Sequence, residues 1–258
     1  MIEFKEYILE IEEYKKDNEN PILLIEIGNT TEIIYAIICL YNLKQRGHHT
    51  ILLTDKKYAN LTHPSIDKLI TFDTNYKFRY KYREYMLKKQ YQWLMPNPKL
   101  ALQFPELMLQ THLVIDQYMQ NSGFTTYDKN IIFKAKPTEQ KQKLVLGKIE
   151  DAQEIIYAAR RKNIYTYNLS GYPYQISHNR PNSDITEQIN VIGQCSIVIG
   201  NDDDNILSLA CCLENKPLIL EKSVDKYSSV REIFNYDKCI NVESNSDIIS
   251  FLNTHKLP

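Results

Sequence analysis

The stretch from Ile22 to Thr54 constrains the fold more than any other part of the chain. It begins with ILLIEI, an apolar run too short for a helix. Gly28, a long apolar segment that Gly47 ends, and a second apolar run, HTILLT, follow in that order. Short runs that are apolar at nearly every position are typical of strands covered on both faces, as in a parallel sheet. Strand, buried helix and strand within about 33 residues indicate a βαβ unit.

A second alternation of strands and helices follows in the C-terminal half. We expect a helix over 106–121 and a link between the two halves near 122–130. The pattern then predicts strands over 130–135, 164–168, 195–200, 217–220 and 238–242, and helices over 149–162, 184–194, 204–214 and 246–255. The sequence therefore predicts an α/β protein of two Rossmann-like, doubly wound domains facing a cleft, one over residues 1–125 and one over 126–258.

The composition excludes several function classes. Lys and Arg number 31 and Asp and Glu 32, so the net charge of −1 offers no global attraction for nucleic acid. The seven glycines form neither GxxxxGK[ST] nor GxGxxG, which argues against a P-loop ATPase and a classical Rossmann dehydrogenase. The five cysteines lack CxxC spacing and the histidines are scattered, so we expect no structural metal site and a reducing compartment.

Two further features predict a cytoplasmic location. The first residues, MIEFKEYILEIEEYKKD, carry charges throughout and do not resemble a secretion signal. The longest apolar run, Ile33 to Tyr41, is about half the length that crosses a bilayer. We therefore expect a cytoplasmic protein, with peripheral contact at the inner face of the membrane as the alternative.

Three segments together resemble one enzyme family. They are ILLIEIGNTTEIIYAIICLYNLKQRG at 22–47, HLVIDQYMQNSGF at 112–124 and CSIVIGNDDDNILSLACCLENKPLIL at 195–220. In this order they resemble the opening strand and turn, the helix before the linker and the nucleotide-binding segment of the ADP-heptose:lipopolysaccharide heptosyltransferases, which have the GT-B architecture. The resemblance implies a glycosyltransferase that moves a sugar from a nucleoside-diphosphate sugar to a glycan or glycolipid acceptor with inversion. It implies no permanently bound cofactor and leaves the divalent metal and the oligomeric state open.

Glu32 is the catalytic base that this resemblance implies. The family turn carries Gly-Asp where this chain has Thr31-Glu32. A carboxylate at the tip of a strand facing a cleft is well placed to take a proton from the attacking hydroxyl. The alternative is structural, because Asn29 followed three residues later by Glu is the pattern of a capping box at a helix start.

The nucleotide-sugar-binding residues are expected in three places. Asp202 matches the aspartate of the family's nucleotide loop, although this chain has Asp202-Asp203-Asp204 there and Ser208 where the family has His. The alternative is that these acids stabilise a helix start, or form the Asp-x-Asp metal motif of GT-A glycosyltransferases. Lys136 is chosen because it follows the strand predicted over 130–135, and a lysine there would neutralise a leaving diphosphate. The full set is Gly28, Asn29, Thr31, Lys136, Gly200, Asp202, Asp203, Asn205 and Ser208.

Aromatic and basic residues alternate from Tyr76 to Arg83. In a strand this pattern places Arg79, Lys81 and Arg83 with the cations of one face. We expect these three to bind an anionic acceptor, such as a phosphorylated glycolipid at a membrane surface. The alternatives are a half-buried edge strand with a solvated basic face and a single-stranded nucleic-acid surface, which the near-zero net charge disfavours.

Two other function classes stay open. The departures from the family pattern fit a non-catalytic, GT-B-like binding protein that kept the architecture and lost the chemistry. A nucleotide-sugar epimerase would act on the donor with no acceptor.

Overall fold

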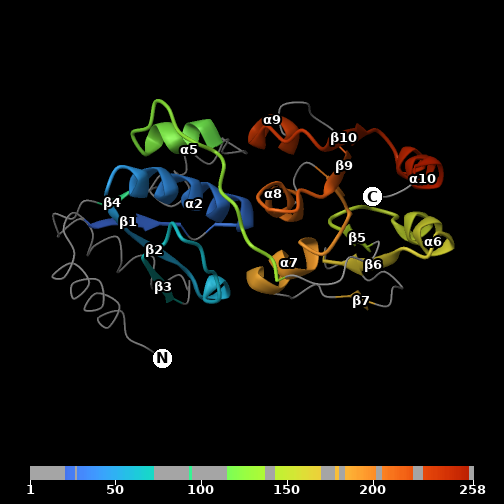
Figure 1. Cartoon of the computed structure of the whole chain (residues 1–258), viewed down its shortest axis with the longest axis horizontal. Coiled ribbons are helices and arrows are strands. Elements are labelled where there is room, and N and C mark those ends of the chain that lie inside the picture. Colours follow the sequence, from blue (N-terminus) through green and yellow to red (C-terminus); the bar gives the residue numbers. More distant parts are fainter. Residues whose placement is uncertain are drawn as a thin grey trace, which may run out of the picture. The chain divides into compact units, whose positions relative to one another are not determined.

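The structure is a computed structural model, and it describes residues 21–26, 28–72, 93–94, 115–136, 143–169, 178–179, 184–201, 205–222 and 229–255. The chain divides into two compact units, Met1–Ile131 and Ile132–Pro258. Each unit contains a parallel β-sheet with helices packed on it (Figure 1).

The first unit has a four-stranded parallel sheet in the order β3-β2-β1-β4. The apolar runs that begin at Ile22 and His49 supply its central strands, as the sequence predicts. The elements are β1 (Pro21–Ile25), α2 (Thr30–Gln45), β2 (His49–Asp55), the 3₁₀ turn η1 (Lys56–Tyr58), β3 (Lys68–Phe72), β4 (Trp93–Leu94) and α5 (Ile115–Asn121).

Helix α2 is buried over most of its length, which explains why its sequence is apolar on nearly all sides. Its buried residues run without a break from Glu32 to Leu40. Asn42 attaches the later part of the unit to this helix, because its Nδ2 donates to the Asp128 carbonyl and its Oδ1 accepts from the Asp128 N–H, both at 2.9 Å. Arg46 stacks over the Phe124 ring at 4.3 Å. These contacts bring the segment before the second unit onto α2.

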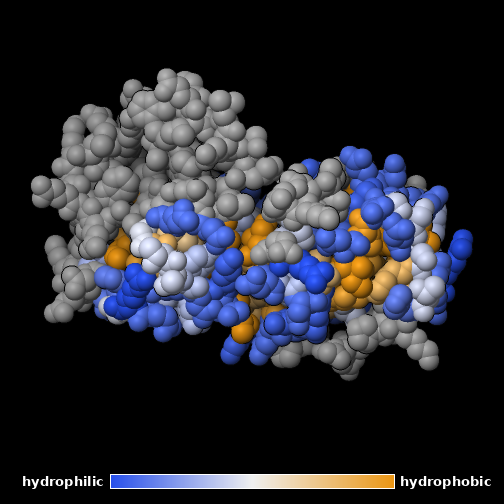
Figure 2. Space-filling view, turned by 90° about the horizontal axis from the view of Figure 1, so that it is seen from above, coloured by the Kyte–Doolittle hydropathy of each residue, from blue (hydrophilic) through white to orange (hydrophobic). Residues whose placement is uncertain are grey.

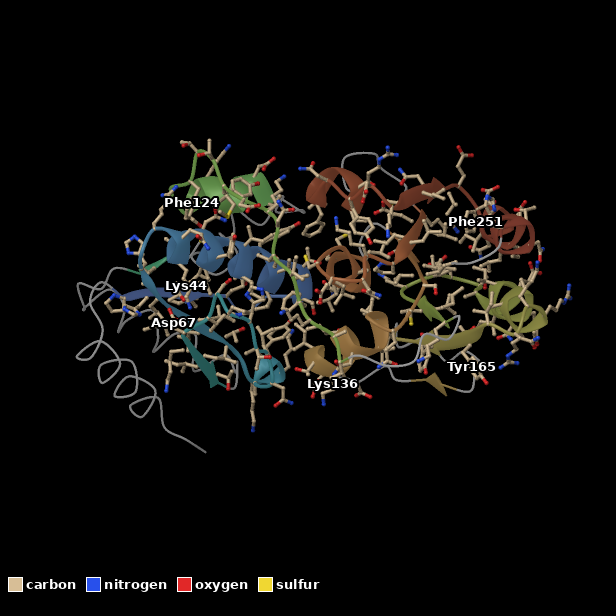
Figure 3. The ribbon with its side chains drawn as sticks, in the orientation of Figure 1. Lys44, Asp67, Phe124, Lys136, Tyr165 and Phe251 are labelled. Atoms are coloured by element: carbon tan, nitrogen blue, oxygen red, sulfur yellow. The ribbon has the colours of Figure 1, made fainter. Side chains whose placement is uncertain are left out.

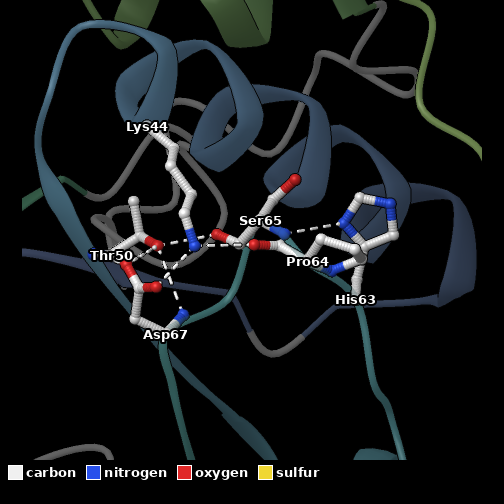
Figure 4. A network of polar contacts seen from close by, with 6 residues as sticks. All are labelled: Lys44, Thr50, His63, Pro64, Ser65 and Asp67. Atoms are coloured by element: carbon white, nitrogen blue, oxygen red, sulfur yellow. Dashed lines mark hydrogen bonds and ion pairs between the residues drawn. The ribbon is translucent and has the colours of Figure 1, made fainter.

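A polar network joins the last turn of α2, the start of β2 and the loop before β3 (Figure 4). Lys44 in the last turn of α2 donates to Asp67 and to the Pro64 carbonyl. Thr50 at the start of β2 donates through its hydroxyl to the Ser65 carbonyl at 2.6 Å and to Asp67 at 3.1 Å. The loop between β2 and β3 is therefore fixed to both the helix and the sheet.

The second unit has a six-stranded parallel sheet in the order β10-β9-β8-β5-β6-β7. Its strands are β5 (Lys143–Leu146), β6 (Tyr165–Asn168), β7 (His178–Asn179), β8 (Ile197–Asn201), β9 (Leu218–Lys222) and β10 (Cys239–Val242). Its helices are α6 (Gln153–Arg161), α7 (Ile185–Ile192), α8 (Asn205–Cys211), α9 (Val230–Phe234) and α10 (Asn245–Thr254).

Both faces of this second sheet are buried. Leu144, Leu146 and Ile199 belong to a core cluster that includes residues of α6 and α10. Successive side chains of a strand point to opposite faces. Val145 and Val198, which alternate with that cluster, are also fully buried. The helices α7, α8 and α9 contact one another in turn and are separate from α6 and α10 in Figure 1. This is the doubly wound arrangement that the sequence predicts.

The predicted first strand of the second half, over 130–135, is wrong. Within the described residues of that segment, only Phe133 forms a β-bridge, with Leu213, and Ile132 is 52% exposed. The neighbouring described residues of this segment form no further β-bridge, so the single bridge does not extend into a strand. The first strand is instead β5, which pairs with β6 and β8 on its two sides. Its apolar core is only Leu-Val-Leu after a lysine-rich stretch, so its pattern is much weaker than that of NIIFKA.

The remaining predictions for the second half are close to the structure. The strands predicted over 164–168, 195–200, 217–220 and 238–242 are β6, β8, β9 and β10, with ends that differ by one or two residues. The helix predicted over 106–121 lies partly outside the described residues, and its last part is α5. The short elements β4, β7 and α9 have too few residues to show a periodic pattern.

Most of the coloured surface in Figure 2 is hydrophilic. Within the part of the chain that the structure describes, no helix is both long enough and apolar enough to span a bilayer.

Candidate functional site

The strand order of the first unit indicates the carboxyl end of β1 as the place for a ligand. The chain proceeds from β1 to β2 and β3 on one side and later adds β4 on the other side of β1. In open parallel sheets, ligands bind at the carboxyl ends of the strands where the strand order reverses in this way. The residues that follow β1 at this point are Glu26 and the turn from Gly28 to Glu32. Four of the predicted site residues, Gly28, Asn29, Thr31 and Glu32, therefore lie together in one turn.

Glu32 closes a complete capping box at the start of α2. The Asn29 side chain accepts from the Glu32 N–H at 2.9 Å, and Glu32 Oε2 accepts from the Asn29 N–H at 2.8 Å. Only 7% of Glu32 is exposed. The structural reading of this motif is therefore correct, and the same contacts hold the carboxylate at the carboxyl end of β1.

Gly28 is required by the close approach of two carboxylates. A Cβ at this position would overlap the Glu32 carboxylate and would lie 2.9 Å from Glu26 Oε1. The Gly28 N–H donates to Glu26 Oε1 at 2.8 Å, and its carbonyl accepts from the Tyr58 hydroxyl at 3.2 Å. Sequence reasoning missed Glu26, because it was counted within the apolar run ILLIEI. A single carboxylate in a fully buried strand is the signal that would have found it.

Tyr58 acts as a hydrogen-bond donor in this cluster. The pKa of its phenol is raised to about 12, mainly by burial. The contact with Thr30 lowers this pKa, whereas the neighbouring carboxylates of Asp55, Glu26 and Glu32 raise it. The phenol is therefore protonated at neutral pH and donates to the Gly28 carbonyl.

The second unit has its own switch point. The chain goes from β5 to β6 and β7 on one side and then returns to add β8, β9 and β10 on the other, so the reversal lies between β5 and β8. Leu146 pairs with Ile199, and the next residue, Gly147, donates its N–H to the Ile199 carbonyl at 2.7 Å. Lys148 and Asn201 each come two positions after a member of the Leu146–Ile199 pair. Both therefore lie at the carboxyl edge of the sheet, where the strand order reverses.

Lys148 and Asn201 are candidate ligand residues that sequence reasoning missed. Lys148 is exposed. Asn201 Oδ1 is buried and has no hydrogen-bond partner in the part of the chain that the structure describes. Because the first strand was predicted in the wrong place, the Gly-Lys turn after it was not recognised.

The other predicted nucleotide-binding residues are distributed around α8. Gly200 is buried in β8 opposite Glu221, and Asn205 is the first residue of α8. Ser208 is 4% exposed within the same helix. Asp202 and Asp203 lie outside the described residues, as do the predicted acceptor-binding residues Arg79, Lys81 and Arg83.

The reason for choosing Lys136 is wrong, because the segment directly before it forms a single β-bridge and not a strand. Its N–H donates to Asn190 Oδ1 near the end of α7, and Figure 3 shows it beside this helix. Helix α7 leads into the amino end of β8. Lys136 is therefore associated with the amino ends of the strands, whereas Lys148 follows a carboxyl end.

The described residues contain no group of three or more His, Cys, Asp or Glu side chains placed to hold a metal ion. Cys212 is buried, and burial raises the pKa of its thiol to about 12. This thiol is therefore not a nucleophile at neutral pH.

Solved structures of glycosyltransferases share with this chain an α/β fold of parallel sheets. The chain is similar to a family 9 glycosyl transferase from Veillonella parvula, with a TM-score of 0.58 and 13% identity over 93% of this chain and 92% of that one. It is also similar to E. coli heptosyltransferase WaaC with ADP, with a TM-score of 0.58 and 10% identity over 90% and 99% of the two chains. E. coli ADP-heptose lps heptosyltransferase II gives a TM-score of 0.53 and 8% identity over 86% and 90%. No protein-family model and no curated protein matches the sequence.

Proposed function

We propose that the protein is an inverting glycosyltransferase that moves a sugar from a nucleoside-diphosphate sugar to a hydroxyl of a glycan or glycolipid acceptor. The observation that carries this proposal is the placement of Glu32 at the switch point of the first sheet. The fold shared with WaaC, whose structure holds ADP, supports an adenosine diphosphate sugar as the donor.

The two units take different substrates in this proposal. The first, predicted over 1–125, presents the acceptor, and the second, predicted over 126–258, holds the donor. Glu32 takes the proton of the acceptor hydroxyl while the acceptor oxygen attacks the anomeric carbon. The bond from that carbon to the diphosphate oxygen breaks, and the nucleoside diphosphate leaves. Lys148, at the second switch point, takes the role assigned to Lys136 and offsets the charge of the leaving diphosphate.

The acceptor side extends to residues outside the described part of the chain. Arg79, Lys81 and Arg83 are the proposed docking residues for an anionic acceptor, with peripheral contact to the inner face of a membrane. Asp202 and Asp203 remain proposed donor contacts together with Gly200, Asn205 and Ser208. Gly28, Asn29 and Thr31 share one turn of the first unit with Glu32, so this proposal moves them from the donor to the acceptor side.

Nucleotide binding is the first test. The midpoint of thermal unfolding is measured with ADP, UDP, GDP and CMP, with and without Mg²⁺ or Mn²⁺. A ligand that binds only the folded state raises this midpoint. A metal-independent rise with ADP supports the proposal, and a rise that requires the metal favours the Asp-x-Asp alternative. No rise with any nucleotide contradicts the proposed donor site.

Sugar transfer is the second test, and the chain offers a matched control. Asp247 forms with Ser244 the same kind of capping box in α10 that Glu32 forms with Asn29 in α2. Glu32→Gln and Asp247→Asn therefore each remove one capping carboxylate. We expect only Glu32→Gln to abolish transfer while nucleotide binding persists. Equal activity of both variants contradicts the assignment of Glu32 as base.

One observation favours a second candidate, a non-catalytic nucleotide-binding protein. Glu32 Oε2 already accepts a backbone hydrogen bond, and the residue is 7% exposed. Such a protein would show the thermal shift with no transfer. An epimerase would instead change the sugar of the donor in a mixture that contains no acceptor.

A further inference from the structure

Glu26 is a buried carboxylate that takes no direct part in the proposed reaction. It is 0% exposed and follows directly after the apolar residues of β1. Burying a carboxylate is costly unless hydrogen bonds satisfy it, so a scaffold position of this kind normally carries an apolar residue. Glu26 lies at the switch point of the first sheet, where the proposed base also lies.

Glu26 is one of two groups that hold the Gly28 peptide. Its Oε1 accepts from the Gly28 N–H at 2.8 Å. On the other side, the Tyr58 hydroxyl donates to the Gly28 carbonyl at 3.2 Å. Both polar backbone atoms of Gly28 are thus bound by side chains, one from the end of β1 and one from η1.

The position of Gly28 in turn determines where Glu32 lies. The Glu32 carboxylate occupies the space that a Cβ of Gly28 would fill. A shift of this glycine toward Glu32 would displace the carboxylate, and a shift away would leave it without packing on that side. The Asn29 N–H that binds Glu32 Oε2 belongs to the next residue of the same turn.

We propose that Glu26 is a positioning residue for Glu32. By accepting the Gly28 N–H, it fixes the turn between β1 and α2 so that the Glu32 carboxylate stays at the carboxyl end of β1. Glu26 is itself fully buried and does not meet the substrate. This inference rests on the proposed function, because Glu26 acts on the reaction only through Glu32.

Two substitutions separate the hydrogen bond from the volume of the side chain. Glu26→Gln keeps an acceptor oxygen for the Gly28 N–H, whereas Glu26→Leu fills similar space without one. We expect Glu26→Leu to lower kcat at least tenfold, to leave the KM for the donor within twofold, and to accelerate hydrogen exchange of the Gly28 amide at least tenfold. We expect Glu26→Gln to stay within threefold of the wild type in all three. A general loss of structure would instead raise the donor KM as well.

Tyr58→Phe is the second variant if Glu26→Leu does not fold. It removes only the hydroxyl that binds the Gly28 carbonyl, and we expect a lower kcat with an unchanged donor KM. Wild-type kcat in a folded Glu26→Leu protein overturns the inference, as does an equal loss in Glu26→Gln and Glu26→Leu.

The amide exchange separates this inference from the proposed function. If the wild type transfers no sugar, the proposed function fails, and the Gly28 exchange in Glu26→Leu alone decides whether Glu26 holds the turn. Unchanged exchange in that variant overturns the positioning role whatever the activity.

Discussion

Lys44 Nζ lies 2.5 Å from Asp67 Oδ1, and this ion pair joins the last turn of α2 to the residue before β3 (Figures 3 and 4). Asp67 Oδ2 accepts from the N–H of Thr50 at 2.9 Å. One carboxylate just before β3 thus binds the end of α2 and the start of β2, at the amino end of the sheet. Glu26 and Glu32, the residues of the proposed site, lie at the carboxyl end of the same sheet.

The loss of stability that replacing Asp67 causes should depend on pH in a defined direction. Partial burial by itself would raise the pKa of Asp67, but hydrogen bonds from Lys44 and Thr50 outweigh it and hold the pKa below its ordinary value of 3.8. A lowered pKa in the folded state stabilises the fold above the unfolded-state pKa, and this contribution is lost as the pH falls through the folded-state value. We expect Asp67→Asn to lower the unfolding free energy by about 1–2 kcal/mol at pH 7.

Urea unfolding at several pH values measures this effect. The difference between wild type and Asp67→Asn should narrow as the pH falls below about 4. Glu150→Gln, at an exposed carboxylate, is the control and should change the unfolding free energy by less than about 0.5 kcal/mol at any of these pH values. A gap between wild type and Asp67→Asn that stays constant with pH would show that the charge of Asp67 is not responsible.

Two buried threonines of β2 should respond differently to the same substitution. Thr50 and Thr54 are both 0% exposed. The Thr50 hydroxyl donates to Ser65, whereas Thr54 Oγ1 has no hydrogen-bond partner in the described part of the chain. Valine has nearly the shape of threonine and removes only the hydroxyl. We expect Thr50→Val to lower the unfolding free energy by about 1–3 kcal/mol and Thr54→Val to leave it unchanged or raise it by about 1 kcal/mol.

The midpoints of urea unfolding of the two variants test this prediction directly. A loss of stability in Thr54→Val as large as that in Thr50→Val would mean that the Thr54 hydroxyl has a partner, such as a bound water.

The fold was predictable because its central strands are covered on both faces. Runs such as ILLIEI and CSIVIG can be buried only in a sheet that helices cover on both sides, and both form central strands. The same criterion gave the wrong strand at 130–135, because NIIFKA is a stronger apolar run than the sequence of β5. Whether such a run gains partner strands on both sides depends on contacts that are distant in the sequence, which a local pattern does not contain.

The candidate site was predictable only in part. The capping pattern of Asn29 and Glu32 is local, so the turn after β1 could be identified. Glu26 and Tyr58 join that turn from different elements, η1 coming 30 residues after Gly28. Lys148 was missed because its position at a switch point follows from the strand order, which the sequence does not give directly.

Lys148 and Lys136 should differ in their effect on nucleotide binding. Lys148 follows the carboxyl end of β5 at the switch point, whereas Lys136 lies beside the end of α7. A lysine that contacts a diphosphate contributes about 1.4 kcal/mol, or tenfold in affinity. We therefore expect Lys148→Ala to weaken ADP binding about tenfold in isothermal titration and Lys136→Ala to change it less than about twofold. If Lys136→Ala weakened ADP binding more than Lys148→Ala, Lys136 would be the diphosphate-binding lysine, and the assignment of Lys148 from the switch point would be contradicted.

Gly28→Ala should impair turnover through the proposed base rather than through the fold alone. Its Cβ would overlap the Glu32 carboxylate, so the carboxylate has to move from the end of β1. Gly47→Ala is the matched control, because its Cβ meets nothing within 4 Å although the residue has a φ of +83°. We expect Gly47→Ala to cost about 1 kcal/mol of unfolding free energy through backbone strain and to keep its transfer activity.

For Gly28→Ala we expect kcat to fall at least about tenfold while ADP affinity, which we assign to the second unit, stays unchanged. Turnover in a folded Gly28→Ala protein equal to that of Gly47→Ala would mean that the carboxylate can leave its observed position at no cost to the reaction. In that case the contact between Gly28 and Glu32 serves the helix start alone, because the geometry of the turn would have no consequence for the chemistry.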